Sequence, residues 1–418
     1  MSRTTARSNP MKPVLVPPSA AVERPVPMRD TVAILTRPLL ALLAATCALL
    51  VAGLYFSQPI SGLIVRDVGL LPQSAGLIVT LTQLGYCGGL LLLTPLGDIM
   101  ENRRLVLATM ACSVVALLVV ASASSGSTFL AASFLVGLSS SAVQMLVPLA
   151  AHMAPAERRG GVVGTMTGGL LLGILLARPL ASTLAGFAGW RSVFAGSALL
   201  TACFLGLLWR RLPVLRPASV ARYPTVVRSL ASLFRRKRVL RKRALSHAAL
   251  FAAFSLFWTS VPWLLTDQGY SQHQIALFAL AGAGGALVAP WAGRLADRGH
   301  TRSVSVAAML LAATGFAVAW RGSSLWLMVI AALAVDAGVQ ANHVAGQREV
   351  LEIEPAARSR LNSVYMSTFF MGGALASSLA GPLYRQAWQY VAALGVTLPL
   401  VALAIYLAHD FGAGRNPD

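Results

Sequence analysis

Twelve apolar runs, each long enough to cross a lipid bilayer as an α-helix, constrain this chain more than any other feature. A membrane-spanning helix needs about 20 predominantly apolar residues. The runs lie at 39–63, 74–96, 104–123, 128–152, 162–186, 190–209, 244–265, 273–293, 303–320, 324–346, 361–382 and 387–408. Only 11% of the residues are charged, whereas a soluble domain usually carries about 25%. We therefore expect an all-α membrane protein with twelve transmembrane helices.

The distribution of basic residues predicts the orientation of these helices. If the N-terminus is inside, the inner segments hold 29 of the 34 Lys and Arg residues and the outer loops hold four. Cytoplasmic loops carry such an excess of basic residues, so we expect both termini in the cytoplasm. The net charge of +20 is spread over loops and tails, and for that reason we do not expect nucleic-acid binding.

The chain divides into two groups of six predicted helices. We expect a proline-rich, disordered cytoplasmic tail at 1–36, a first bundle at 37–209, a cytoplasmic linker at 210–243, a second bundle at 244–409 and a cytoplasmic tail at 410–418. The linker holds twelve basic residues and no acids. Either it connects the bundles and is weakly attracted to anionic headgroups, or it is a binding site for anionic lipid or nucleic acid.

Internal similarity indicates that the second bundle repeats the first. Asp98 aligns with Asp297 at an offset of 199 residues, and the segment 155–158 aligns with 355–358 at an offset of 200. Parallel repeats of this kind place a substrate cavity between the halves, near the membrane midplane.

Two short polar loops share an acid that is followed by basic residues. We expect them to act as cytoplasmic latches that brace the gate, and not as substrate sites. Asp297 is expected to pair with a neighbouring arginine or to face a helix N-terminus. The latch residues are Asp98, Arg103 and Arg104 in the first half, and Asp297, Arg298 and Arg302 in the second.

These features resemble the major facilitator superfamily over nearly all of 37–410. The loop at 293–302 retains four residues of that family's loop signature: Gly293, Asp297, Arg298 and Arg302. The segments 55–60, 80–86 and 189–194 are similar to the bacterial proton-antiporter and sugar-efflux branch. Its helix-five motif corresponds here to Gly164, Gly168, Gly169 and Gly173, followed by Arg178-Pro179, with an arginine where the branch has a glycine.

The resemblance implies a secondary transporter of the bacterial inner membrane that works by alternating access. We expect it to export a small organic molecule in exchange for protons. An importer of a small organic solute and a transport-inactive sensor or scaffold are the alternatives. No phosphate-binding loop of the Gly-x-x-x-x-Gly-Lys-Ser/Thr type occurs in the sequence, so we expect no enzyme activity on ATP and no cofactor.

Two charged residues lie deep within the predicted spans. Asp336 lies near mid-membrane, where low dielectric favours a neutral carboxyl, and it is the predicted proton-coupling residue. Alternatively, it is neutralised by Arg178. Arg178 is predicted to bind an anionic group of the substrate, to pair with Asp336 or to extend towards the outer headgroups. Intramembrane ionisable residues of this kind are usually functional.

Uncharged polar and aromatic residues complete the predicted cavity. Each polar residue is expected either to line the cavity or to join helices through a hydrogen bond. The candidates are Gln58, Gln83, Gln144, Gln340 and Asn342, with Tyr55 and Trp258 as rings that could stack on a substrate. His343, two turns from Asp336, either relays a proton or is hydrogen-bonded at an interface. We expect no metal site. The expected partners are a small-molecule substrate, protons and membrane lipids, and the protein is expected to be a monomer.

Overall fold

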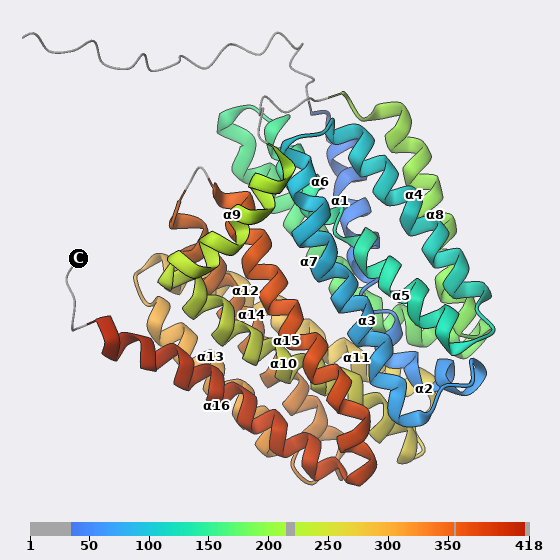
Figure 1. Ribbon diagram of the computed structural model, residues 1–418. Helices are drawn as coiled ribbons and strands as arrows, with labels where there is room; N and C mark the ends of the chain where they lie inside the picture. The colour runs from blue at the N-terminus through green and yellow to red at the C-terminus, as the bar shows by residue number, and fades with distance from the viewer. Residues whose placement is uncertain (1–34, 215–221, 355–356, 414–418) are drawn as a thin grey trace, which may run out of the picture. The chain divides into compact units, whose positions relative to one another are not determined.

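The computed structural model describes residues 35–214, 222–354 and 357–413, and every regular element among them is helical. The predicted tails, 1–36 and 410–418, lie largely outside these residues. The first half contains α1 (Arg37–Ala52), α2 (Ser57–Asp67), α3 (Ala75–Gly88), α4 (Asn102–Ser122), α5 (Gly126–Ser140), α6 (Val143–His152), α7 (Arg159–Ala188) and α8 (Trp190–Arg211). After α9 (Tyr223–Arg236), the second half contains α10 (Arg238–Asp267), α11 (Gln272–Ala279), α12 (Ala283–Asp297), α13 (Thr301–Val318), α14 (Leu325–Glu352), α15 (Arg358–Gln386) and α16 (Trp388–Ala413), as Figure 1 shows.

Each predicted run coincides with one helix or with consecutive helical segments. Ten of the segments are long and apolar enough to cross a membrane, and the bent pair α1–α2 adds one more span. The remaining span is α15, which is 29 residues long. It is less apolar because serines such as Ser363, Ser367 and Ser377 lie on its buried faces. The all-α architecture with twelve spans is therefore confirmed.

Four spans are not continuous α-helices, which the hydropathy pattern did not indicate. The first is bent by 47° between α1 and α2, at residues 53–56. The second continues from α3 through a π turn at Gly89–Leu93, and the fourth is divided between α5 and α6. The eighth passes through a 3₁₀ turn at Leu280–Gly282. Irregular backbone is tolerated at membrane depth only where protein or a cavity covers it, and the breaks at 53–56 and 280–282 border the site described below.

The predicted basic linker contains a helix. Helix α10 begins at Arg238, six residues before the predicted start of the seventh span, and α9 lies between it and α8. Val226, Leu230 and Leu233 are buried on one face of α9, at the three- and four-residue spacing of an amphipathic helix. The helix contacts both halves, because the Tyr223 hydroxyl donates to the carbonyl of Leu92 at 2.9 Å and α9 also packs on α10 and α15.

The two halves meet along three helix pairs, α3 with α15, α7 with α11 and α2 with α10. In the first pair, the hydroxyl of Thr80 donates to the carbonyl of Ala374 at 3.0 Å. The backbones come close at two glycines: a Cβ on Gly76 would lie 2.0 Å from the carbonyl oxygen of Ser377, and one on Gly381 would lie 2.1 Å from that of Gln73. Small residues therefore set the distance between the halves.

Two of the four glycines singled out in the fifth span pack closely against α1. A Cβ on Gly169 or Gly173 would lie 2.5 or 2.2 Å from a backbone carbonyl oxygen of α1, as close packing requires. In contrast, no atom lies within 4 Å of a Cβ built on Gly164 or Gly168. The close approach of α7 to α1 thus concerns the part of α7 that leads to Arg178.

We predict that Gly381→Ala lowers the stability of the protein, because the added methyl group would overlap the carbonyl oxygen of Gln73. Overpacking of this kind typically costs about 1–3 kcal/mol. The measurement is the thermal unfolding midpoint of the purified protein in detergent, followed by tryptophan fluorescence.

Gly206→Ala is the matched control, since no atom lies within 4 Å of the added Cβ. Its midpoint should be unchanged or slightly raised, because alanine favours a helix more than glycine does. Equal midpoints for the two variants would contradict the close approach of α15 to the first half.

Candidate functional site

The two intramembrane charges come together between the halves. Arg178 on α7 is 2% exposed and Asp336 on α14 is 3% exposed. Both face Gly282, in the 3₁₀ turn of the eighth span: a Cβ placed there would lie 3.5 Å from Nη1 of Arg178 and 2.9 Å from Oδ2 of Asp336. We call Arg178, Asp336 and the residues around them (Tyr55, Gln58, Phe254, Trp258 and Gly282) the central site.

Arg178 is held by one hydrogen bond and by aromatic rings. Its Nε donates to Oε1 of Gln58 at 2.9 Å. Its guanidinium carbon lies 4.2 Å from the centroid of the Trp258 ring and 5.1 Å from the centroids of Tyr55 and Phe254. Such cation–π contacts stabilise a desolvated guanidinium. Nη2 of Arg178 and Nε2 of Gln58 are buried and have no hydrogen-bond partner.

Asp336 accepts a hydrogen bond from Trp258, whose indole Nε1 donates to Oδ1 at 2.6 Å. Among the ion pairs of the described residues, none joins Asp336 to Arg178. The two opposite charges thus lie near each other, beside Gly282 and the ring of Trp258, without direct contact. The alternative that Arg178 neutralises Asp336 stays a prediction.

Two of the predicted cavity glutamines take part in hydrogen-bond networks between helices. Nε2 of Gln83 donates to Ser255 on α10 at 2.8 Å, and Ser255 lies 2.9 Å from the hydroxyl of Ser377 on α15. Gln144 donates to the hydroxyl of Tyr86 and accepts from Asn362, both at 3.1 Å. Both networks join helices of the two halves.

The other two predicted polar residues lie on α14 with Asp336. The Cγ of Gln340 would be 2.9 Å from a Cβ on Gly285, so this side chain packs against the eighth span one turn from Asp336. Asn342 is 1% exposed and its Oδ1 has no hydrogen-bond partner.

His247, which is buried, and His343, which is half-buried, form a second polar cluster nearer the linker side of the second half. Nδ1 of His247 lies 2.6 Å from the hydroxyl of Tyr365, and the ring centroids of His247 and His343 are 5.1 Å apart. Nδ1 of His343 has no hydrogen-bond partner. No group of three or more metal-ligating side chains occurs among the described residues.

Sequence reasoning missed Phe254 and Gly282 in the central site. Phe254 precedes Trp258 by four residues and therefore lies on the same face of α10, which is a signal that the sequence contains. Gly282 has no such signal, because its importance comes from what faces it across the site.

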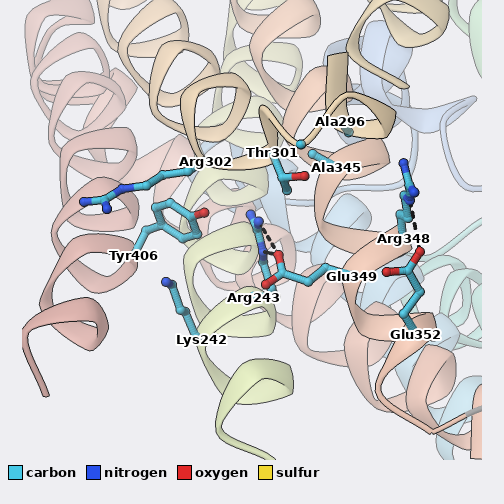
Figure 2. A pocket seen from close by; sticks show the side chains of 11 residues that line it. Lys242, Arg243, Ala296, Thr301, Arg302, Ala345, Arg348, Glu349, Glu352 and Tyr406 are labelled. Atoms are coloured by element: carbon cyan, nitrogen blue, oxygen red, sulfur yellow. Dashed lines mark hydrogen bonds and ion pairs between the residues drawn. The ribbon is translucent and has the colours of Figure 1, made fainter. Parts of the chain in front are cut away.

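The second-half latch forms an ion-pair network in which Asp297 has a partner the sequence did not suggest. Arg348 on α14 pairs with Asp297, and its Nε also donates to Glu352 at 3.0 Å. Next to this network is a pocket of about 410 Å³, lined also by Arg302. Figure 2 shows Arg348 pointing toward Glu352, and Arg243 toward Glu349, with which it pairs.

The first-half latch is different. The side chain of Asp98 lies outside the described part of the structure. Arg103 donates to the carbonyl of Trp209, and Arg104 pairs with Glu101 at 3.2 Å. In the second half, Arg298 is exposed at the end of α12. In the described part of the structure, the first loop is thus linked to α8 through Arg103 and the second is linked to α14 through Asp297.

Comparison with known proteins gives a consistent result. The sequence profile of the Major Facilitator Superfamily matches residues 40–298 and 243–416. The "Uncharacterized transporter YgaY" of Escherichia coli O157:H7 is 40% identical over 376 residues, which are 89% of this chain and 95% of that protein. A "Probable sugar efflux transporter" of Pasteurella multocida is 25% identical over 272 residues, 64% of this chain and 66% of that one. The crystal structure of a D-xylose–proton symporter superposes with a TM-score of 0.69 over 89% of this chain and 98% of that chain, at 16% identity, and so resembles it in fold.

We predict that Asp297→Asn shifts the balance between the states open to the two sides of the membrane, because it removes a charge that Arg348 contacts. The distance between spin labels at the linker-side ends of α6 and α14 measures this shift. The swap Asp297→Arg with Arg348→Asp should restore the original distance distribution.

Arg104→Gln in the first-half loop is the comparison variant, and its shift should be smaller. A distribution that Asp297→Asn leaves unchanged would refute the latch.

Proposed function

This chain belongs to the major facilitator superfamily and is a multi-pass membrane transporter, and we propose that it exports a small organic molecule in exchange for protons. In this proposal the substrate binds in the central site, and Asp336 carries the proton. The protein is a monomer in the bacterial inner membrane with both termini in the cytoplasm, and it has no enzymatic activity or cofactor.

The observation that carries the proposal is the environment of Asp336. Burial disfavours the charged form of a carboxyl, whereas a nearby cation and a hydrogen-bond donor favour it. Asp336 is subject to all three influences, since it is 3% exposed, faces Arg178 across Gly282 and accepts a hydrogen bond from Trp258. A carboxyl balanced in this way can change its protonation state when a substrate adds or removes a charge beside it.

The contacts between the halves support alternating access. The central site takes Arg178 and Gln58 from the first half and Trp258 and Asp336 from the second. A rocking motion of one half against the other would therefore separate Arg178 from Asp336 and change the surroundings of both. In one cycle the substrate can then leave the cell while a proton enters it.

Two observations support export and an inner-membrane location. The relative from Pasteurella multocida is named as a sugar efflux transporter, and the relative that is 40% identical is bacterial. The orientation follows from the excess of basic residues on the linker side.

We predict that Asp336→Asn abolishes proton-driven transport but preserves exchange of substrate for substrate. The transported compound is found first, by comparing deletion and overexpression strains for tolerance across several hundred compounds. Its accumulation is then measured in inverted membrane vesicles with an imposed proton gradient, and counterflow is measured in vesicles without one.

Asp267→Asn is the control, because it neutralises an exposed acid at the outer end of α10. It should leave both activities unchanged. Gradient-driven accumulation in Asp336→Asn equal to that of the unaltered protein would remove Asp336 from the coupling mechanism.

A charge swap distinguishes coupling from a purely structural role of the two charges. If Arg178 and Asp336 only balance each other, Arg178→Asp with Asp336→Arg should restore gradient-driven transport. We expect the double variant to stay inactive, because Gln58 and Trp258 are positioned for the original charges.

A further inference from the structure

We propose that the substrate is a zwitterion of the amino-acid type, with its carboxylate bound by Arg178 and Gln58 and its ammonium group bound by Asp336. This inference rests on the proposed function, because it assigns a substrate class to the same site. In the central site two buried donors lack acceptors, two opposite charges lie on either side of Gly282, and aromatic rings surround them.

The first half of the site offers donors that have no acceptor. Nη2 of Arg178 and Nε2 of Gln58 are both buried and unpaired, although the two side chains are joined by the bond from Nε to Oε1. Buried donors are rarely left without an acceptor. A carboxylate supplies several acceptor positions and binds a guanidinium through strong, charge-assisted hydrogen bonds. These two donors therefore fit a carboxylate of the substrate.

The second half of the site offers a carboxylate for a cation. Oδ1 of Asp336 accepts the indole hydrogen bond, whereas Oδ2 faces the place where a Cβ of Gly282 would be. The same place is 3.5 Å from Nη1 of Arg178. Gly282 thus packs closely against both charges, and its lack of a side chain lets them lie near enough for one small group to reach both when the halves separate.

The presence of both charges decides between ligand classes. A cationic ligand would leave Arg178 uncompensated in a medium of low dielectric, which is costly. An anionic ligand would leave Asp336 to be neutralised by a proton, so that ligand and proton would not compete. A ligand with a carboxylate and an ammonium on neighbouring atoms compensates both charges at once. The hydroxyl groups of a sugar would compensate neither of them.

The rings in the site fit the remainder of such a ligand. Trp258, Tyr55 and Phe254 surround the guanidinium, and all three side chains are buried. They form an apolar wall against which an aliphatic or aromatic side chain can pack. Because the ammonium group and the proton would both bind Asp336, they compete, and this competition would couple export to proton entry.

The test uses a series of probes that vary the charge and the size of the ligand. L-phenylalanine is the zwitterion, L-phenylalaninamide the cation and N-acetyl-L-phenylalanine the anion; glycine and L-leucine vary the size, and D-glucose is the sugar. Apparent affinities are obtained from the ligand-dependent shift of the thermal unfolding midpoint of the purified protein at one pH. The best zwitterion should bind about tenfold more tightly than either singly charged derivative.

The variants assign each charge to its residue. Arg178→Gln should abolish the preference for the zwitterion over the amide, and Asp336→Asn should abolish the preference over the N-acetyl derivative. Gly282→Ala should weaken zwitterion binding about tenfold, because the methyl group would crowd Oδ2 of Asp336, 2.9 Å away. Gly196→Ala, at which a Cβ meets no neighbour within 4 Å, should leave binding unchanged. The midpoint without ligand reports whether each variant is folded.

Three results would overturn the inference: equal binding of a singly charged derivative, tighter binding of D-glucose, or no binding of any of the three zwitterions. Its failure is distinguishable from failure of the proposed function. If Asp336→Asn abolishes proton-driven transport of the compound found by the tolerance screen but zwitterions are not preferred, coupling stands and the substrate class is wrong.

Discussion

The burial of two opposite charges, one on each half, is the constraint on which the rest of this structure depends. An arginine or an aspartate at the centre of a membrane helix costs roughly 2.5–3.5 kcal/mol. Here Arg178 and Asp336 are stabilised by a glutamine, by an indole N–H group and by three aromatic rings, but not by a direct ion pair. Each charge is therefore held in place while part of its binding capacity stays available for a ligand.

The packing of the helices brings these groups to the same place. Gly169 and Gly173 let α7 approach α1, which positions Arg178 next to Gln58. Gly76 and Gly381 let α3 approach α15 where the halves meet. The interruption of the eighth span at Leu280–Gly282 places a glycine, and not a side chain, opposite both charges. Small residues and breaks in helices thus form the site as much as the charged side chains do.

Much of the fold could be predicted from the sequence, because apolar runs of about 20 residues have few alternatives to membrane-spanning helices. The helix α9 could also have been predicted, since Val226, Leu230 and Leu233 have the spacing of one apolar helix face. In contrast, the partners of the polar residues could not be predicted. Gln83 is hydrogen-bonded to a serine 172 residues away, and Gln144 is hydrogen-bonded to an asparagine 218 residues away. Asp297 forms an ion pair with an arginine 51 residues away. Hydropathy says how deep a residue lies, but not which helix faces it.

The proposed coupling requires that Asp336 gains and loses a proton within the membrane, and infrared difference spectroscopy can measure this without a substrate. Spectra of the purified protein in lipid are recorded over a series of pH values, for the unaltered chain and for Asp336→Asn. We predict a carbonyl band of a protonated carboxyl that disappears as the pH rises and is missing in the variant. The same series of bands in both proteins would mean that Asp336 does not change its protonation state, and would contradict the proposed coupling.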